Sequence, residues 1–223
     1  MESDLGQTTN QVNLLLRAAR TIFWDFDGVI KDSVEAKTLA YETLFLPYGR
    51  DVATRVRLHH EANGGVSRFE KIPLYLAWAG ESATDARVQE FCERFSRLAM
   101  QAVIDSPWVP GVREYLTEHH ARQYFVLVSA TPHDEMQQIL HLLDLAHYFR
   151  EVHGAPTKKA DAIEDVLRRL QLTPDRVLMV GDADTDLMAA QKNAVPFLLR
   201  RTLLNKTLQA RYSGPMFENL THE

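Results

Sequence analysis

Short apolar runs alternate with amphipathic segments over most of the chain. The runs are rich in β-branched and aromatic residues and end at turn-forming or charged positions, which is typical of buried strands. They cover residues 21–26, 124–128, 176–180 and 195–199. Helical periods cover residues 111–120, 133–143, 158–170 and 183–193. This alternation predicts an α/β fold, a doubly wound parallel sheet with helices on both faces.

One long segment, residues 33–106, interrupts the alternation. It contains no convincing strand, but apolar positions recur at helical spacing, for example Ala36, Leu39 and Ala40. We therefore expect an inserted α-helical domain that covers one end of the sheet. The expected organisation is an N-terminal extension (1–20), an α/β core domain (21–32 and 107–223) and the helical domain (33–106).

Composition and charge narrow the class of protein. With 223 residues, 45% hydrophobic and 25% charged, the chain is typical of a soluble globular protein. The net charge of -5 provides no basic surface for nucleic acid, and no apolar run reaches the roughly 18 residues of a membrane span. Cys92 is the only cysteine, and acidic residues near the N-terminus do not fit an export signal. We expect a cytoplasmic protein, monomeric or homodimeric, that binds neither nucleic acid nor membranes.

Two of the predicted strands end in clustered carboxylates, at the edge where parallel α/β sheets bind their ligands. Residues 25–28 read Asp-Phe-Asp-Gly, although acidic glycine turns are common and this motif alone is weak. Asp182, Asp184 and Asp186 follow the run at 176–180, and charges so close repel unless a cation or water lies among them. Such oxygen ligands suit Mg²⁺, whereas Asp184 alone is equally explained as a helix cap.

Two further segments carry groups suited to an anion. Ser129, Ala130 and Thr131 follow another strand, and a hydroxyl with free N–H groups suits a phosphate oxygen. A simple helix cap explains the same hydroxyls. Lys158 and Lys159 begin a helical segment, where the macrodipole disfavours a cation. A lysine at that position is expected either to have an anionic partner or to be solvated.

Together and in this order, the four segments resemble the motifs of the haloacid dehalogenase superfamily. The matching positions are residues 25–28, Ser129, Lys159 and residues 181–186. The resemblance extends over nearly the whole chain after Arg20 and implies a Rossmann-like core. The helical segment after the first motif is similar to the small cap domain of the phosphoglycolate phosphatase and β-phosphoglucomutase branch.

The resemblance implies a role for each motif residue. Asp25 is expected to be the nucleophile that forms an aspartyl-phosphate intermediate, and Asp27 to act as general acid and base. Ser129, Ala130 and Lys159 are expected to bind phosphate, with Lys158 as the alternative to Lys159. The implied cofactor is Mg²⁺, held by Asp25, the backbone carbonyl of Asp27, Asp182, and Asp186 directly or through water.

The function implied is a magnesium-dependent phosphatase that acts on a small phosphorylated metabolite, with sugar phosphates favoured by analogy alone. Asp27 argues against the dehalogenase and phosphonoacetaldehyde hydrolase branches, which lack this second aspartate. A phosphomutase keeps both aspartates and is the alternative. A non-catalytic protein that binds phosphorylated metabolites is expected to lose Asp25, Asp27 or Asp182, and none of them is missing.

Substrate contacts are expected in residues 59–71, where two glycines lie between helical periods beside polar side chains. In capped relatives a similar Gly-x-Ser-Arg segment faces the active site. The candidates are Arg68, whose planar fork suits a carboxylate or phosphate, and Asn63. The alternative is that Ser67 caps a helix while Arg68 and Lys71 are solvated.

The neighbouring His59 and His60 suggest a transition-metal site at first sight. Sequence neighbours on a helix point apart, however, so they do not converge on one ion. We expect a solvated pair of histidines.

Overall fold

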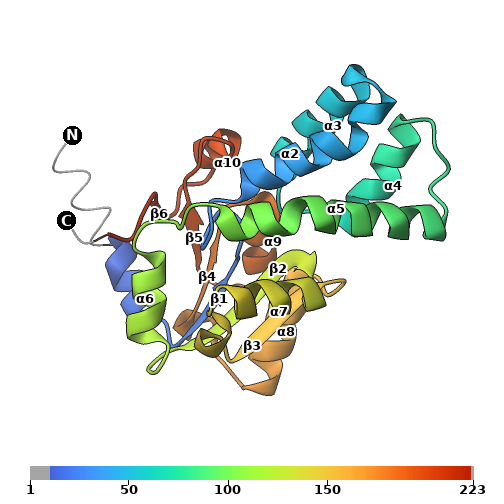
Figure 1. Ribbon diagram of the computed structural model, residues 1–223. Coiled ribbons are helices and arrows are strands. Elements are labelled where there is room, and N and C mark those ends of the chain that lie inside the picture. The colour runs from blue at the N-terminus through green and yellow to red at the C-terminus, as the bar shows by residue number, and fades with distance from the viewer. Residues whose placement is uncertain (1–10, 222–223) are drawn as a thin grey trace.

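Six parallel strands form one sheet in the computed structural model, which describes residues 11–221 (Figure 1). Their order is β3-β2-β1-β4-β5-β6. The strands are β1 (Thr21–Trp24), β2 (Tyr124–Pro132), β3 (Glu151–Ala155), β4 (Val177–Gly181), β5 (Phe197–Arg200) and β6 (Met216–Phe217). Every residue of β1 is buried, because this strand lies between β2 and β4 and is covered on both faces. The predicted parallel sheet is confirmed.

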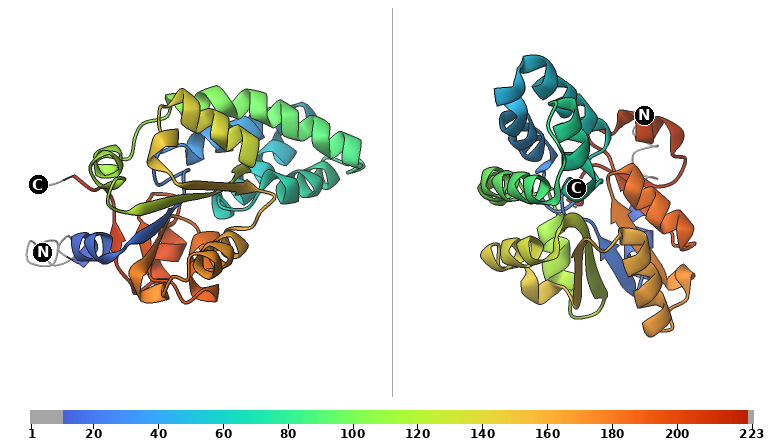
Figure 2. Two further views of the ribbon diagram at one scale, coloured as in Figure 1. Left: turned by 90° about the horizontal axis from the view of Figure 1, so that it is seen from below. Right: turned by 90° about the vertical axis from the view of Figure 1, so that its right-hand side faces the viewer.

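Helices cover both faces of the sheet (Figure 2). Along β1 the side chains alternate, so that Ile22 and Trp24 enter one hydrophobic cluster and Phe23 the other. Residues 11–18, α6 (Val112–His119) and α7 (His133–Leu142) contribute to the first cluster. The helices α8 (Lys159–Arg169), α9 (Asp184–Lys192) and α10 (Lys206–Arg211) contribute to the second. This is the doubly wound α/β fold that the pattern predicts.

Four α-helices between β1 and β2 project beyond the sheet (Figure 1). They are α2 (Val34–Phe45), α3 (Arg50–Ala62), α4 (Arg68–Trp78) and α5 (Asp85–Asp105). They build a hydrophobic cluster of their own, in which the rings of Tyr41 and Phe95 stack at 3.9 Å between centroids. The C-terminal end of α5 also packs against the sheet cluster through Val103. The end of α5 and the chain at the start of α2 thus connect these helices to the core.

The sheet is wider than the apolar pattern indicates, since neither β3 nor β6 is predicted. In β3, Glu151 and His153 are only partly buried, so this strand lacks a continuous apolar run. Strand β2 also continues to Pro132, past its predicted end at Val128. The added residues include Ser129 and Thr131, which are polar but buried.

The two ends of the chain pack against the α/β core where the structure describes them. Val12 and Leu16, within the predicted N-terminal extension, are buried in the first sheet cluster, whereas residues 1–10 lie outside the described part. Near the other end, the backbone N–H of Leu220 donates to the carbonyl of Pro110 at 2.8 Å. Among residues 11–221, no helix combines the length and apolarity that crossing a membrane requires.

The strand order brings the motif-bearing ends together. Because β1 pairs with β2 on one side and β4 on the other, the chain leaves these three strands at the same edge of the sheet. The residues that follow are Asp25, Asp182 and the last part of β2 from Ser129 onward. Ligands of open α/β sheets bind at such an edge, where the strand order reverses.

Candidate active site

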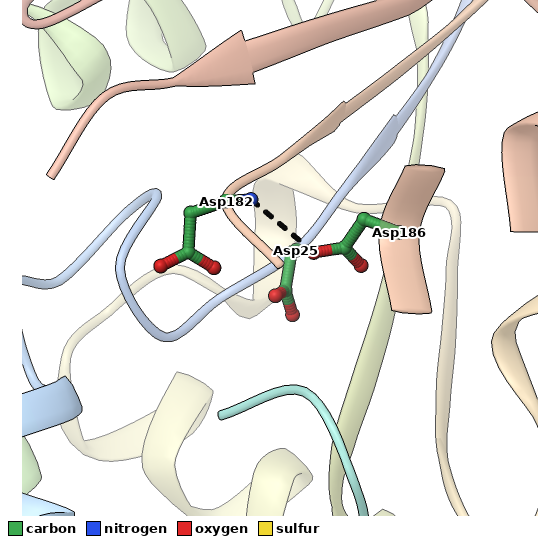
Figure 3. Close-up of side chains that lie close together, drawn as sticks. All are labelled: Asp25, Asp182 and Asp186. Carbon is green, nitrogen blue, oxygen red and sulfur yellow. Dashed lines mark hydrogen bonds between the residues drawn. The ribbon is translucent and has the colours of Figure 1, made fainter. Parts of the chain in front are cut away.

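Three buried carboxylates converge at the end of β1 and β4 (Figure 3). Asp25 follows β1, Asp182 follows β4, and Asp186 lies in the first turn of α9. One oxygen of each lies within 4.8 Å of the others. Gly28 makes room for them, because a Cβ atom there would lie 2.1 Å from Oδ2 of Asp182. Its φ of +78° is also one that glycine adopts readily.

Asp25 is held by one backbone donor and one lysine. Its Oδ1 accepts from the backbone N–H of Phe26 at 2.8 Å, and its Oδ2 lies 2.8 Å from Nζ of Lys159. Burial, followed by repulsion from Asp186, raises the pKa of Asp25 to about 7. The carboxylate is therefore positioned on both oxygens and responsive to any added positive charge.

Asp186 organises the loop and the lysine. Its Oδ2 accepts from the backbone N–H groups of Asp182 at 3.2 Å and Ala183 at 3.0 Å, and its Oδ1 accepts from Lys159 at 2.6 Å. Burial would lower the pKa of Lys159, but Asp186 and Asp25 raise it, so this lysine is an ammonium. Of the two sequence candidates, Lys159 is buried against the carboxylates and Lys158 is exposed.

The donor set fits a hard divalent cation. Burial raises the pKa of Asp182 well above its usual value, and repulsion by Asp25 and Asp186 adds to the effect. Three carboxylates face a single ammonium, that of Lys159, so a cation among them would relieve the excess negative charge. Carboxylate oxygens are the ligands that Mg²⁺ prefers. Both oxygens of Asp186 accept hydrogen bonds that fix the loop and Lys159, and those of Asp25 interact with Phe26 and Lys159, so each of these two residues would share an oxygen with the cation.

Asp27 lies in a network of its own. Its Oδ2 accepts from Nζ of Lys37 at 2.5 Å and from Oγ1 of Thr131 at 3.3 Å, and its Oδ1 accepts from Oγ of Ser33 at 2.6 Å. Burial acts to raise the pKa of Asp27, but the Lys37 ammonium and the Ser33 hydroxyl hold it below its usual value. The sequence pattern does not predict that Lys37 contacts Asp27, because apolar spacing shows only that α2 is a helix.

The predicted phosphate-binding segment lines the same region. A cavity between the sheet edge and helices α2–α5 is bordered by Asp25, Asp27 and Asp182 and also by Ala130 and Thr131. Ser129 is buried, and its Oγ accepts from the backbone N–H of Thr131 at 3.1 Å. It borders an adjoining hollow that shares Ala130 and Lys159 with the cavity.

Arg68 reaches the cavity wall but is already paired. Its guanidinium donates two hydrogen bonds to the Glu135 carboxylate, at 2.6 and 2.8 Å, and a third to the hydroxyl of Ser96. Ser67 caps α4 by accepting from the backbone N–H of Phe69 at 3.4 Å, as the alternative reading expects. The expectation of a solvated Arg68 is wrong, because an ion pair with α7 compensates its charge and allows 96% of its surface to be buried. The pair joins α4 to the core.

Asn63 lies apart from the carboxylates. It borders a separate hollow beside the start of α9 and donates from Nδ2 to the carbonyl of His59 at 2.9 Å. This hydrogen bond closes the last turn of α3. The cavity that contains Asp25 is therefore formed without its side chain.

The expected solvated histidine pair is wrong for His60. The two rings do point apart, and Nδ1 of His59 lies 3.0 Å from the hydroxyl of Tyr75. His60, by contrast, is buried and its Nδ1 lies 2.8 Å from Nζ of Lys71, which is also buried. Both residues border the cavity. Lys71 was expected to be solvated in one reading, but α4 turns this side of the helix inward.

Comparison with known proteins indicates the family of this chain. A family model for haloacid dehalogenase-like hydrolases matches residues 19–193. Phosphoglycolate phosphatase 1 of Pseudomonas aeruginosa is 26% identical over 191 residues, covering 80% of this chain and 68% of that protein. The phosphoglycolate phosphatase of Vibrio cholerae is 27% identical over 190 residues, covering 80% and 82%.

Solved structures of similar fold include β-phosphoglucomutase from Clostridium difficile and a predicted phosphoglycolate phosphatase from Haemophilus somnus. The first has a TM-score of 0.71 at 17% identity and covers 91% of this chain and 92% of its own. The second has a TM-score of 0.68 at 18% identity and covers 91% and 95%. At these identities the two structures demonstrate the fold alone.

The fold and the site define a class of α/β enzyme in which buried carboxylates and a lysine meet at the carboxyl ends of the central strands. More particularly, this chain belongs to the haloacid dehalogenase-like hydrolase family. The resemblance drawn from the four sequence motifs is confirmed. The curated relatives also support the expected enzyme class, that of phosphoric monoester hydrolases.

Proposed function

We propose that this protein is a magnesium-dependent phosphatase that hydrolyses a small phosphorylated metabolite through an aspartyl-phosphate on Asp25. The observation that carries the proposal is the convergence of Asp25, Asp182 and Asp186 beside a cavity, with Lys159 paired to Asp25 and Asp186. A carboxylate nucleophile needs positive charge nearby, because an anionic phosphate ester is otherwise repelled by about 4 kcal/mol at 4 Å and an effective dielectric of 20.

In the first step, an oxygen of Asp25 attacks phosphorus and the bond to the leaving oxygen breaks. Lys159, the Ser129 hydroxyl and the backbone N–H of Ala130 hold the transferring oxygens, so that their charge is stabilised as it develops. Asp27 in its acid form donates a proton to the leaving alkoxide, so the step requires the proton that Lys37 and Ser33 disfavour in the free protein.

In the second step, Asp27 takes a proton from the water that attacks phosphorus and releases Asp25. Lys37 and Ser33 hold the Asp27 carboxylate in place for both transfers. Asp25, Asp182 and the backbone carbonyl of Asp27 would hold Mg²⁺, with Asp186 supporting the loop. When bound, Mg²⁺ supplies charge that offsets the approach of two anionic groups.

We further propose that α2–α5 act as a cap that shields the reaction from water. Gly65, in the turn between α3 and α4, lies so close to the core that a Cβ atom there would be 1.9 Å from Oγ1 of Thr185. The Arg68–Glu135 pair is a second link between the helices and the core. The similarity to β-phosphoglucomutase concerns the fold alone, whereas the curated relatives are phosphatases. We therefore propose that the phosphoryl group is transferred to water.

The test is phosphate release from a panel of phosphorylated metabolites, measured with and without Mg²⁺. Asp25→Asn is the variant that removes the nucleophile, and Asp184→Asn is the matched control, because Asp184 is half-exposed and pairs with Arg211. We expect release that requires Mg²⁺, disappears in Asp25→Asn and persists in Asp184→Asn. Turnover retained in Asp25→Asn would refute the proposal.

A further inference from the structure

A buried amine and a buried imidazole face the cavity without an acidic partner. Lys71 in α4 is 1% exposed and His60 in α3 is 2% exposed. Nζ of Lys71 lies 2.8 Å from Nδ1 of His60, and its other contact is the carbonyl of Gly64 at 3.5 Å. Nε2 of His60 is buried and has no hydrogen-bond partner among the residues that the structure describes.

The other cations of the cavity wall are all compensated. Lys159 pairs with Asp25 and Asp186, Lys37 pairs with Asp27, and Arg68 pairs with Glu135. Within residues 11–221, Lys71 is thus the one lysine or arginine of this wall that forms no ion pair. Removing such a group from water is costly unless a counter-charge is supplied.

Hydrogen-bond chemistry indicates what would complete the pair. An ammonium at Lys71 donates to Nδ1 of His60, so the proton of the ring lies on Nε2 and this atom is a second donor. The face of Tyr41, 5.7 Å from Nζ, adds to the environment that favours a cation. The Lys71 ammonium has three N–H donors and only the two neutral acceptors at His60 and Gly64, and Nε2 of His60 has no acceptor among the described residues. In a cavity that Asp25 also borders, this pair of donors suits a compact anionic oxygen group.

Electrostatics supports the same reading. Burial, followed by repulsion from Lys37, holds the pKa of Lys71 well below its usual value. Burial, followed by repulsion from Lys71, holds the pKa of His60 well below its usual value. An anion in contact with both groups would reverse these effects, since an opposite charge favours the protonated form of each.

We infer that Lys71 and His60 form a subsite for a second anionic group, a carboxylate or another phosphoryl, at the non-reacting end of the substrate. The inference rests on the proposed function, because it assigns the reacting phosphoryl group to Asp25. The substrate class that follows is a phosphate monoester that bears a second anion. This class is narrower than phosphorylated metabolites in general.

The test uses phosphonates, which bind without being hydrolysed. Calorimetry in the presence of Mg²⁺ compares propylphosphonate, which has one anionic group, with 3-phosphonopropionate and propane-1,3-bisphosphonate, which have two. The variants are Lys71→Met, Lys71→Arg and His60→Gln. Lys206→Met is the matched control, because it removes a positive charge from an exposed position on α10.

We expect the wild type and Lys206→Met to bind one of the two compounds with a second anionic group at least about tenfold more tightly than propylphosphonate, as a buried charged contact allows. The preferred compound identifies the second anion as a carboxylate or a phosphoryl group. Lys71→Met is expected to reduce the preference to about twofold or less, His60→Gln to weaken it, and Lys71→Arg to restore part of it. Thermal unfolding of each variant verifies that it is folded.

Equal affinity for all three compounds in the wild type, no binding at all, or an undiminished preference in folded Lys71→Met would overturn the inference. A separate assay distinguishes failure of the subsite inference from failure of the proposed function. Magnesium-dependent hydrolysis of p-nitrophenyl phosphate, which has no second anion, tests Asp25 chemistry independently of Lys71. A preference that depends on Lys71 in a protein that hydrolyses nothing would support the subsite and refute the phosphatase.

Discussion

Replacing Arg68 by methionine separates two roles for this residue, a substrate contact and a structural link. Its side chain is 3% exposed and that of Glu135 is 9% exposed, so the substitution leaves a carboxylate buried without its counter-ion. Breaking a buried pair on one side costs about 3 to 5 kcal/mol. Ser96 still donates to Glu135 at 2.6 Å, which favours the lower end of that range.

The assay is urea unfolding of Arg68→Met, Glu135→Met and the double variant. With a slope typical of small proteins, a loss of about 3 kcal/mol moves the midpoint by about 1 to 3 M. The double variant is expected to be more stable than Arg68→Met, because two apolar side chains replace the pair and no charge is left unpaired. Arg168→Met, at an exposed pair with Asp165, is the control and should barely move the midpoint.

Additive losses in the double variant would refute the reasoning, since they would mean that the two residues do not interact. An unchanged midpoint in Arg68→Met, together with a lower kcat/KM, would instead identify Arg68 as a substrate contact that the Glu135 pair does not hold.

Three other predictions concern the carboxylate site. Lys159→Met should lower kcat by about 10²- to 10³-fold, and an equal loss in Lys158→Met would contradict the choice of lysine. Because the pKa of Asp25 is raised to about 7 from 3.8, the native metal-free protein retains a proton that the unfolded chain releases. Its free energy of unfolding should therefore fall as pH rises from about 4 to about 7, and a pH series in urea should show a flatter profile for Asp25→Asn. Gly28→Ala should weaken Mg²⁺ binding about 10- to 100-fold by calorimetry, because its Cβ would displace Asp182. Gly80→Ala, with a similar φ of +75° and open space around it, separates backbone strain from this clash.

The positions of the core motifs follow from local pattern. A buried central strand reads as an apolar run, and an amphipathic helix has a period of 3.6 residues, whatever the rest of the chain does. Asp25 and Asp182 end such runs, and parallel β-α-β units bring strand ends to one edge of a sheet. The α/β fold and the meeting of these two residues could therefore be predicted from the sequence alone. The half-polar edge strand β3 could not, because its side chains are only partly buried.

Tertiary structure decided which polar side chains meet across the cavity. Arg68 and Glu135 are 67 residues apart, and the surface of α4 that buries Lys71 against His60 is defined by packing against α2, α3 and α5. The local sequence around Arg68, His60 and Lys71 is equally compatible with solvated and with buried side chains. The free energy of burying a charge depends on partners that other helices supply. The residues to which we assign the proposed chemistry could thus be predicted from the sequence. Those we expect to select the substrate became apparent only when the helices were folded over the sheet.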